Sequence, residues 1–388
     1  MTDAAGEIGQ LLRRYRPGVR VAVGDGLGAP RLLSAALSQA AAEIGDVRLL
    51  LGWLPTPDEG LDFDAFADAR TFMSGWGLRT PVAAGQVRVV PVRLSGIPAL
   101  LHGPLRPDVL VATVVRRPDG GLGFGAEVSW QRAAVDAGAV VAGVLASGYP
   151  CCEVGPPLPA EQVVVVAETA DEPAELAFSE PTDAHRAMAG RVSALIPEGA
   201  RLQVGPGPLG TAVLDAVTTP VRLDSGLLPG GVVDLAGRGL LVGEPVGSYL
   251  AGGRAMFDWA DGRPILHRLE HTHDIGRLST GSPFVAVNTA IEVDEQAQVN
   301  VEAVGGVVIG GIGGHPDYAA AATRSAGGLS IVAVASSHRG ASTLVSRLSA
   351  PVSTPGHDVG VLVTESGVAD LRGLDRDERR RAVCALFE

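Results

Sequence analysis

The chain has 388 residues and a mass of 39.6 kDa, a length that suits two α/β domains better than one small core. With 46% apolar and 19% charged residues it can bury a large core, which excludes collagen, coiled coils and disorder. The net charge is −12 and the sequence holds no lysine. A phosphate backbone would meet a repulsive field, so we expect no nucleic acid partner.

Repeated segments divide the chain into two similar halves. Residues 18–26 (GVRVAVGDG) recur as residues 199–207 (GARLQVGPG), and a helical run follows each copy. Each copy therefore predicts a strand, a glycine-rich turn and a helix, the opening of a βα unit. Near-continuous apolar runs at 109–115, 163–167 and 359–364 are typical of buried parallel strands. These patterns predict an α/β fold of two similar, open, mostly parallel domains.

The boundary between the two domains is expected in an acidic, proline-bearing stretch at 169–183. It separates the predicted strand at 163–167 from a predicted helix that runs from residue 184 toward 196. We therefore assign residues 1–178 to an N-terminal domain and residues 179–388 to a C-terminal domain.

Cysteine usage and hydrophobic patterning predict the cellular compartment. Cys151 and Cys152 are adjacent and cannot close an ordinary disulfide, and Cys384 is the third cysteine, which favours a reducing compartment. The first residues carry acid where a signal peptide carries base, and no apolar run approaches the ~20 residues that span a bilayer. We expect a cytoplasmic protein that does not contact a membrane.

Three glycine clusters are candidate ligand loops: residues 24–28 (GDGLG), residues 205–210 (GPGPLG) and residues 310–314 (GGIGG). Glycine at a strand end allows backbone N–H groups to approach an anion closely, but an ordinary tight turn produces the same pattern. None of the clusters has the dinucleotide-binding spacing, and a P-loop is impossible without lysine. The third cluster has more glycine than a turn needs, which favours a ligand there.

Two further patterns are ambiguous. His267 and His271 have the i, i+4 spacing of a metal site, but the zincin order of residues is missing, so we favour polar surface and expect no metal. Glu292 and Asp294 share one face of a strand predicted at 287–294. Paired carboxylates can act as acid and base, although the outward face of any strand gives the same pattern.

Several segments resemble the acetyl-CoA hydrolase/transferase family, whose members include acetate and 4-hydroxybutyrate CoA-transferases. They are residues 287–294 (VNTAIEVD), 298–300 (QVN), 310–314 (GGIGG), 363–373 (VTESGVADLRG) and 231–235 (GVVDL), and together the likeness extends over essentially the whole chain. The resemblance implies two class I CoA-transferase domains with the active site in the cleft between them. It also implies coenzyme A or acyl-CoA as substrate or ligand, no separate cofactor, and a small carboxylic acid as partner.

Three functional positions of that family are changed in this chain. Such enzymes use a glutamate that attacks the thioester, giving an acyl-glutamyl anhydride and then a glutamyl-CoA thioester. The family pattern resembles H-T-E-M-x-S-D-G-V-V-D-L, which aligns the glutamate with Gly226, and a shifted alignment would offer Asp224. One oxyanion donor falls on Pro206, which has no N–H to give. An asparagine of the family is replaced by His273.

The resemblance implies that the CoA thioester contacts glycine-loop residues. They are Gly205, Gly207, Gly311, Ile312, Gly313 and Gly314.

Three functions remain open from the sequence. One is a thioester hydrolase or CoA-transferase with a rearranged site, in which His273 or Glu292 serves as the base. Another is a non-catalytic CoA-binding homologue or the partner subunit of an active CoA-transferase, and the third is an altered activity on a ligand other than CoA. We expect a homodimer or an association with a second CoA-transferase-like subunit.

Overall fold

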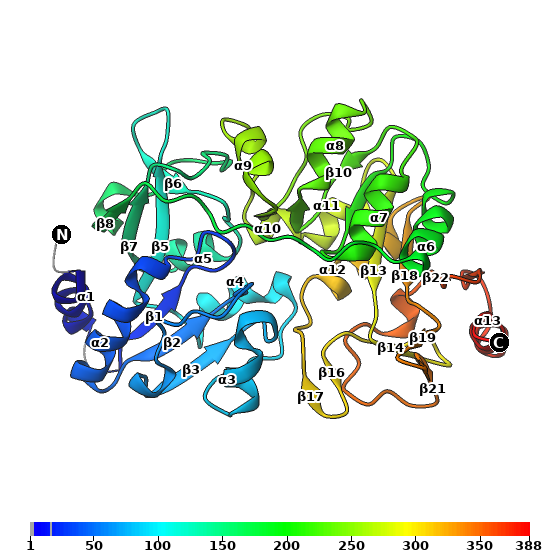
Figure 1. Ribbon diagram of the computed structural model, residues 1–388, viewed down its shortest axis with the longest axis horizontal. Coiled ribbons are helices and arrows are strands. Elements are labelled where there is room, and N and C mark those ends of the chain that lie inside the picture. The colour runs from blue at the N-terminus through cyan, green and yellow to red at the C-terminus, as the bar shows by residue number, and fades with distance from the viewer. Residues whose placement is uncertain (1–3, 16–17) are drawn as a thin grey trace.

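The two copies of the repeat form the first strands of two separate sheets. A computed structural model describes residues 4–15 and 18–388. Figure 1 shows the two sheets side by side, with the blue and cyan part of the chain in one and the green to red part in the other. Both sheets are mostly parallel, which confirms the predicted α/β class.

The central strands of the first sheet are apolar runs that are buried on both faces. The predicted strand at 163–167 forms an edge of this sheet and is largely exposed, which corrects its expected burial. In the described residues the sheet has eight strands in the order β4-β3-β2-β1-β5-β7-β8, with β6 antiparallel to β5. The strands are β1 (Arg20–Val23), β2 (Arg48–Leu51), β3 (Asp68–Thr71), β4 (Arg88–Val89), β5 (Val109–Arg116), β6 (Leu122–Phe124), β7 (Val140–Ala146) and β8 (Val163–Thr169). The helices are α1 (Ala4–Leu12), α2 (Ser34–Ile44), α3 (Arg79–Ala83), α4 (Ile97–Leu101) and α5 (Gln131–Asp136).

The second sheet repeats this plan. Its order is β10-β9-β13-β18-β22-β23, and its pairs are parallel except for the last. The strands are β9 (Arg201–Val204), β10 (Arg222–Leu223), β13 (Phe284–Thr289), β18 (Leu329–Ala333), β22 (Val361–Val363) and β23 (Val368–Asp370). The helices are α6 (Asp183–Ser193), α7 (Pro208–Ala216), α8 (Gly231–Gly237), α9 (Arg254–Ala260), α10 (Leu269–Thr272), α11 (Ile275–Ser279), α12 (His315–Arg324) and α13 (Arg376–Leu386).

Short strands of the second half lie outside both large sheets. They are β11 (Leu227–Pro229), β12 (Tyr249–Ala251), β14 (Glu292–Asp294), β15 (Val299–Asn300), β16 (Ala303–Val304), β17 (Val307–Val308), β19 (Ser337–His338), β20 (Ala341–Ser342) and β21 (Leu344–Val345). Strands β16 and β17 form an antiparallel hairpin that precedes the glycine loop at 310–314.

The segment around β11 and β12 packs onto the first half of the chain. Val128 N–H donates to the Ser248 carbonyl (2.9 Å), and Leu250 N–H donates to the Ala126 carbonyl (2.9 Å). Buried side chains of both halves belong to one continuous hydrophobic cluster. The two sheets therefore share a core, and the division at residues 178 and 179 remains a prediction.

The structure corrects one predicted strand. The segment 287–294 is not continuous: β13 ends at Thr289 in the large second sheet, and β14 begins at Glu292 in a small sheet with β15 and β21. The alternation of apolar and polar residues is interrupted at the break, where two polar residues (288–289) precede two apolar ones (290–291), and it resumes in β14.

The cysteines and the helices bear on the predicted compartment. Cys151, Cys152 and Cys384 are free thiols, and Cys152 is buried. None of the helices in the described residues has the length and hydrophobicity that crossing a bilayer requires.

Candidate functional site

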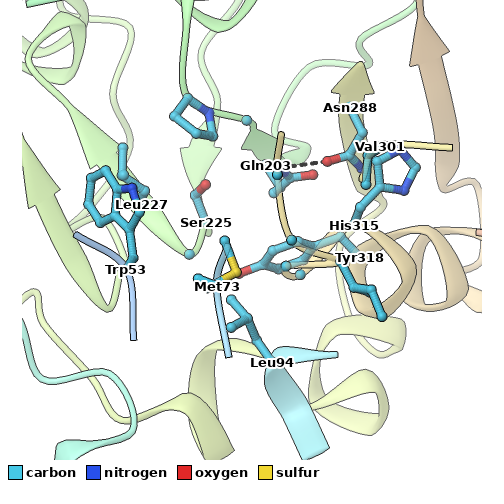
Figure 2. Close-up of a pocket in the computed structure, with 18 of the residues that line it drawn as sticks. Trp53, Met73, Leu94, Gln203, Ser225, Leu227, Asn288, Val301, His315 and Tyr318 are labelled. Atoms are coloured by element: carbon cyan, nitrogen blue, oxygen red, sulfur yellow. Dashed lines mark hydrogen bonds between the residues drawn. The ribbon is translucent and has the colours of Figure 1, made fainter. Parts of the chain in front are cut away.

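A cavity of about 330 Å³ lies where the two halves meet. Figure 2 shows side chains from both halves around it, with Trp53 and Leu227 on one side and Tyr318 and His315 on the other. Its size falls in the range of small-molecule sites. The first half contributes Trp53, Met73, Trp76 and Leu94, and the second half contributes Gln203, Val204, Gly205, Pro206, Ser225, Gly226, Leu227, Tyr249, His273, Asn288, Thr289, Val301, Gly310, Gly311, Ile312, Gly313, Gly314, His315 and Tyr318.

The glycine loop at 310–314 closes one wall of the cavity. Ser74 Oγ donates to the Gly310 carbonyl (2.5 Å) and Leu94 N–H donates to the Gly313 carbonyl (3.0 Å), so the first half holds the loop in place. Gly313 has φ +63°, a conformation that favours glycine. Within the described residues, the N–H groups of residues 311–314 donate no hydrogen bond. They are available to a carbonyl oxygen or an anion in the cavity.

Gly226 faces the cavity between β10 and β11, at the position predicted for the lost nucleophile. A Cβ atom on Gly226 would lie 3.0 Å from Tyr318 Oη, and 3.1 and 3.2 Å from Cε1 and Nε2 of His273. Its carbonyl accepts hydrogen bonds from the N–H groups of Ser248 (2.7 Å) and Tyr249 (3.1 Å), which fixes the backbone. Any side chain at this position would therefore extend toward His273 and Tyr318.

The second glycine turn places only part of its predicted set at the cavity. Gly205 and Pro206 line the wall, whereas Gly207 does not and instead precedes helix α7. Gly205 N–H donates to the Val287 carbonyl (3.2 Å) of the neighbouring strand, and proline has no N–H. This side of the cavity thus has no backbone donor at Gly205 or Pro206 for an oxyanion.

His273 and Tyr318 form the polar floor below Gly226. Their ring centroids are 4.7 Å apart, and both His273 Nε2 and Tyr318 Oη are buried without a hydrogen-bond partner among the described residues. His273 Nδ1 lies 2.9 Å from Thr272 Oγ1. Burial, together with the nearby Arg277 guanidinium, lowers the pKa of His273 to about 3, so the imidazole is neutral at pH 7.

Three more polar side chains face the cavity with unsatisfied atoms. Gln203 Nε2 donates to Asn288 Oδ1 (3.4 Å), which leaves Gln203 Oε1 and Asn288 Nδ2 without partners in the described part of the chain. His315 Nδ1 contacts Thr354 Oγ1 (2.7 Å), and its Nε2 is free. Burial lowers the pKa of His315 to about 4. Buried polar atoms normally have partners, so these groups are suited to a ligand with hydrogen-bonding atoms.

Asp224, two residues before Gly226, is a structural residue. Its carboxylate accepts two hydrogen bonds from the Arg277 guanidinium (2.8 and 2.7 Å) and lies 3.7 Å from Arg201. It is not among the residues that line the cavity. The two cations hold this carboxylate outside the cavity.

Glu292 is also outside the cavity. Its Oε1 accepts hydrogen bonds from Asn300 Nδ2 (2.9 Å) and Ser349 Oγ (2.8 Å), which connect β14 to β15 and to the loop after β21. Asp294 is buried and accepts from Gln298 Nε2 (2.7 Å). The two carboxylates therefore stabilise the small sheet.

His267 and His271 do not line the cavity. The rings of His267 and His271 stack at a centroid distance of 4.2 Å, and His267 precedes helix α10. Burial, with the neighbouring histidine, lowers the pKa of His267 to about 4. The described residues contain no group of three or more potential metal ligands.

The first glycine turn, residues 24–28, encloses two buried carboxyl groups. Asp25 Oδ2 accepts hydrogen bonds from Trp53 N–H (2.9 Å), Trp130 Nε1 (3.0 Å) and Tyr249 Oη (2.9 Å). Glu127 Oε2 accepts from Gly28 N–H (2.9 Å). Burial raises the pKa of Asp25 to about 6, and burial together with Asp25 raises that of Glu127. The glycines here pack against protein atoms.

Aromatic residues at the site could not be found from the sequence. Trp53 and Tyr249 are isolated single residues, 196 positions apart, and neither belongs to a motif or a periodic pattern. His315 and Tyr318 gave a weaker signal, because they directly follow the glycine cluster at 310–314.

Comparison with known proteins finds similarity to CoA-transferases. The acetyl-CoA hydrolase/transferase C-terminal domain family matches residues 252–386. The chain is 25% identical over 325 residues to a 4-hydroxybutyrate coenzyme A transferase of Clostridium kluyveri, which covers 79% of this chain and 75% of that protein. A butyryl-CoA:acetate CoA-transferase of Anaerostipes caccae is 25% identical over 386 residues, 91% of this chain and 86% of the relative.

Among solved structures, RipA from Yersinia pestis has the same fold. Its TM-score is 0.88 at 21% identity, over 100% of this chain and 94% of that chain.

Proposed function

Because this chain belongs to the acetyl-CoA hydrolase/transferase family, we propose that it binds CoA thioesters in the cavity around Gly226 and does not form the covalent glutamyl intermediate. The relatives named above are transferases that act on 4-hydroxybutyrate or on butyryl-CoA and acetate. The thioester carbonyl would lie against the free N–H groups of residues 311–314, with the acyl group inside the cavity.

One observation carries the proposal: the wall of the cavity holds no carboxylate in the described part of the chain. The position aligned with the family's glutamate is Gly226, which has no side chain. A Cβ atom there would face His273 and Tyr318. Asp224, the alternative, is bound to Arg277. Without a carboxylate in contact with the thioester, no glutamyl anhydride can form. The free energy of the thioester bond is then not conserved in a covalent intermediate. Loss of the nucleophile and of one oxyanion donor removes groups that act as a unit.

Direct hydrolysis receives little help from the same residues. A general base works best when its pKa is near the working pH, and the pKa of His273 is about 3. Neutral His273 and the Tyr318 hydroxyl are suited to hydrogen bonding with the acyl group. They are poorly suited to activating water.

Calorimetry with CoA and acetyl-CoA, followed by thiol release with and without acetate, tests the proposal. We expect acetyl-CoA to bind without acetate-dependent exchange. Exchange in the unaltered protein would overturn the loss of the covalent route, and absence of binding would overturn the assignment of the ligand.

A double variant tests the role of Gly226 by restoring the nucleophile. Gly226→Glu needs space beside His273, so we combine it with His273→Asn, the residue type that the family pattern implies there. We expect acetate-dependent exchange to appear, with Gly226→Gln/His273→Asn as the control that matches its size but lacks the carboxylate. Equal exchange in both variants would contradict the assignment of Gly226 to the nucleophile position.

A further inference from the structure

The cavity is lined by uncharged groups. No Asp, Glu or Arg side chain is among its lining residues in the described chain, and lysine does not occur in the sequence. His273 and His315 face it as neutral imidazoles. In the proposed pose the thioester carbonyl takes the free N–H groups of residues 311–314. A charged group on the acyl chain would then lose its hydration without gaining an ion pair.

The nearest ionisable groups behind one wall are acids. Asp25 accepts hydrogen bonds from Tyr249 Oη and Trp53 N–H, and both of those residues line the cavity. Glu127 lies against the same turn, where its Oε2 accepts from Gly28 N–H. When these acids ionise, they add a repulsive field for an anionic ligand. Once these acids are ionised, the wall therefore adds electrostatic repulsion to the desolvation cost of a ligand carboxylate.

The same wall presents aromatic rings in a fixed arrangement. Trp53 packs edge to face against Tyr249 (5.7 Å between centroids) and against Trp76 (5.9 Å). Trp53 and Tyr249 are each 6% exposed, and the Trp53 backbone N–H and the Tyr249 hydroxyl both donate to Asp25. Trp76 adopts φ +50°, a conformation that is rare for a bulky residue and that tends to occur at functional sites. Such edge-to-face geometry gives a further ring a favourable packing surface.

Size adds to this argument. The cavity volume is about 330 Å³, and an apolar cavity of about 150 Å³ already holds a benzene molecule. We propose that the site selects CoA thioesters whose acyl group is uncharged and carries a ring, and that it rejects acyl groups ending in a carboxylate. This inference rests on the proposed function, because it places the acyl group in the cavity.

Binding of three thioesters to the full chain tests the selectivity. Butyryl-CoA and succinyl-CoA have the same acyl length and differ by a terminal carboxylate, and benzoyl-CoA adds a ring. We expect butyryl-CoA to bind at least about tenfold more tightly than succinyl-CoA, and benzoyl-CoA to bind most tightly. Free CoA provides the reference affinity without an acyl group.

A variant that adds a positive charge tests whether the side chains that line the cavity set the preference, rather than the net charge of the protein. Met73→Arg places a cation at the cavity, because Met73 lines it, and should reduce the preference for butyryl-CoA over succinyl-CoA about tenfold. Val307→Arg adds the same charge on the exposed β16–β17 hairpin, away from the lining, and should leave the preference unchanged.

The outcomes separate the two proposals. Equal affinity for all three thioesters, or tighter binding of succinyl-CoA, would overturn the selectivity and leave CoA-thioester binding intact. If none of the thioesters bound, the proposed function would fall, and the selectivity with it. The wild-type series decides the question even if Met73→Arg does not fold.

Discussion

The turns that follow the first strand of each half are similar in sequence, but they differ in what surrounds their glycines. A Cβ atom on Gly24 would lie 2.5 Å from Gln131 Oε1, and one on Gly28 would lie less than 3.0 Å from the Glu127 carboxylate. On Gly205 and Gly207, a Cβ atom would meet nothing within 4 Å. The first turn needs glycine because protein atoms fill the space beside it. The second turn leaves open space beside Gly205, at the wall of the cavity, and beside Gly207, outside the cavity. Glycine content alone therefore does not indicate a binding loop.

The buried aspartates of the two halves extend the comparison. Asp224 is paired with Arg277 and Arg201, whereas Asp25 is surrounded by neutral donors and has Glu127 close by. The buried carboxylate of Asp224 is stabilised by two cations. At Asp25 the described residues supply no cation, and burial favours the protonated form.

The largest effect is expected when the ion pair of the second half is broken. Asp224→Asn leaves the Arg277 guanidinium without its bidentate partner next to a buried region, and should lower the free energy of unfolding by about 3 kcal/mol. Urea denaturation measures the loss, with Asp215→Asn on the exposed side of α7 as a control that should change little. A loss below about 1 kcal/mol would show that the pair is not a structural element.

A smaller effect is expected from adding one methyl group to each turn. Gly28→Ala forces the buried Glu127 side chain to move and should cost about 1–3 kcal/mol of unfolding free energy. Gly205→Ala adds its methyl to open space and should stay within about 0.5 kcal/mol. Thermal or urea unfolding of the two variants gives the comparison directly, and equal losses would break the distinction between the turns.

The smallest effect concerns pH. The pKa of Asp25 is raised from 3.8 to about 6, so the folded state binds this proton more tightly than the unfolded state does. The resulting stabilisation is complete below about pH 4 and is lost as the pH rises through 6. Asp25→Asn lacks this loss, and should be about 1 kcal/mol more stable than the wild type at pH 7.5, because weaker hydrogen bonds offset part of the gain.

Unfolding curves between pH 4.5 and 7.5 check that prediction. The difference between the two proteins should shrink toward pH 4.5. A difference that did not vary with pH would mean that Asp25 does not titrate in this range.

Short sequence patterns predicted the elements that form within a short stretch of the chain. The strand, turn and helix of each repeat follow from 18–26 and 199–207, and the alignment of Gly226 and Pro206 with family motifs led to two residues that do line the cavity. Trp53 and Tyr249 depend on contacts between distant parts of the chain, which no short pattern encodes. The placement of Glu292 was missed because one strand was predicted across residues 287–294. Two polar residues at 288–289 and two apolar residues at 290–291 interrupt the alternation where β13 ends.

Because the cavity lies between the halves, binding of a ligand there would raise the stability of the folded protein. Leu94 N–H to the Gly313 carbonyl, and Ser95 N–H to Asp317 Oδ2 (3.0 Å), join the halves at its rim. A ligand that touches both walls adds its binding free energy to these contacts, about 2.7 kcal/mol at 100 times its dissociation constant. Stability of this size changes the amount of a protein that escapes proteolysis several-fold. The abundance of the protein in its cell would then follow the supply of its ligand.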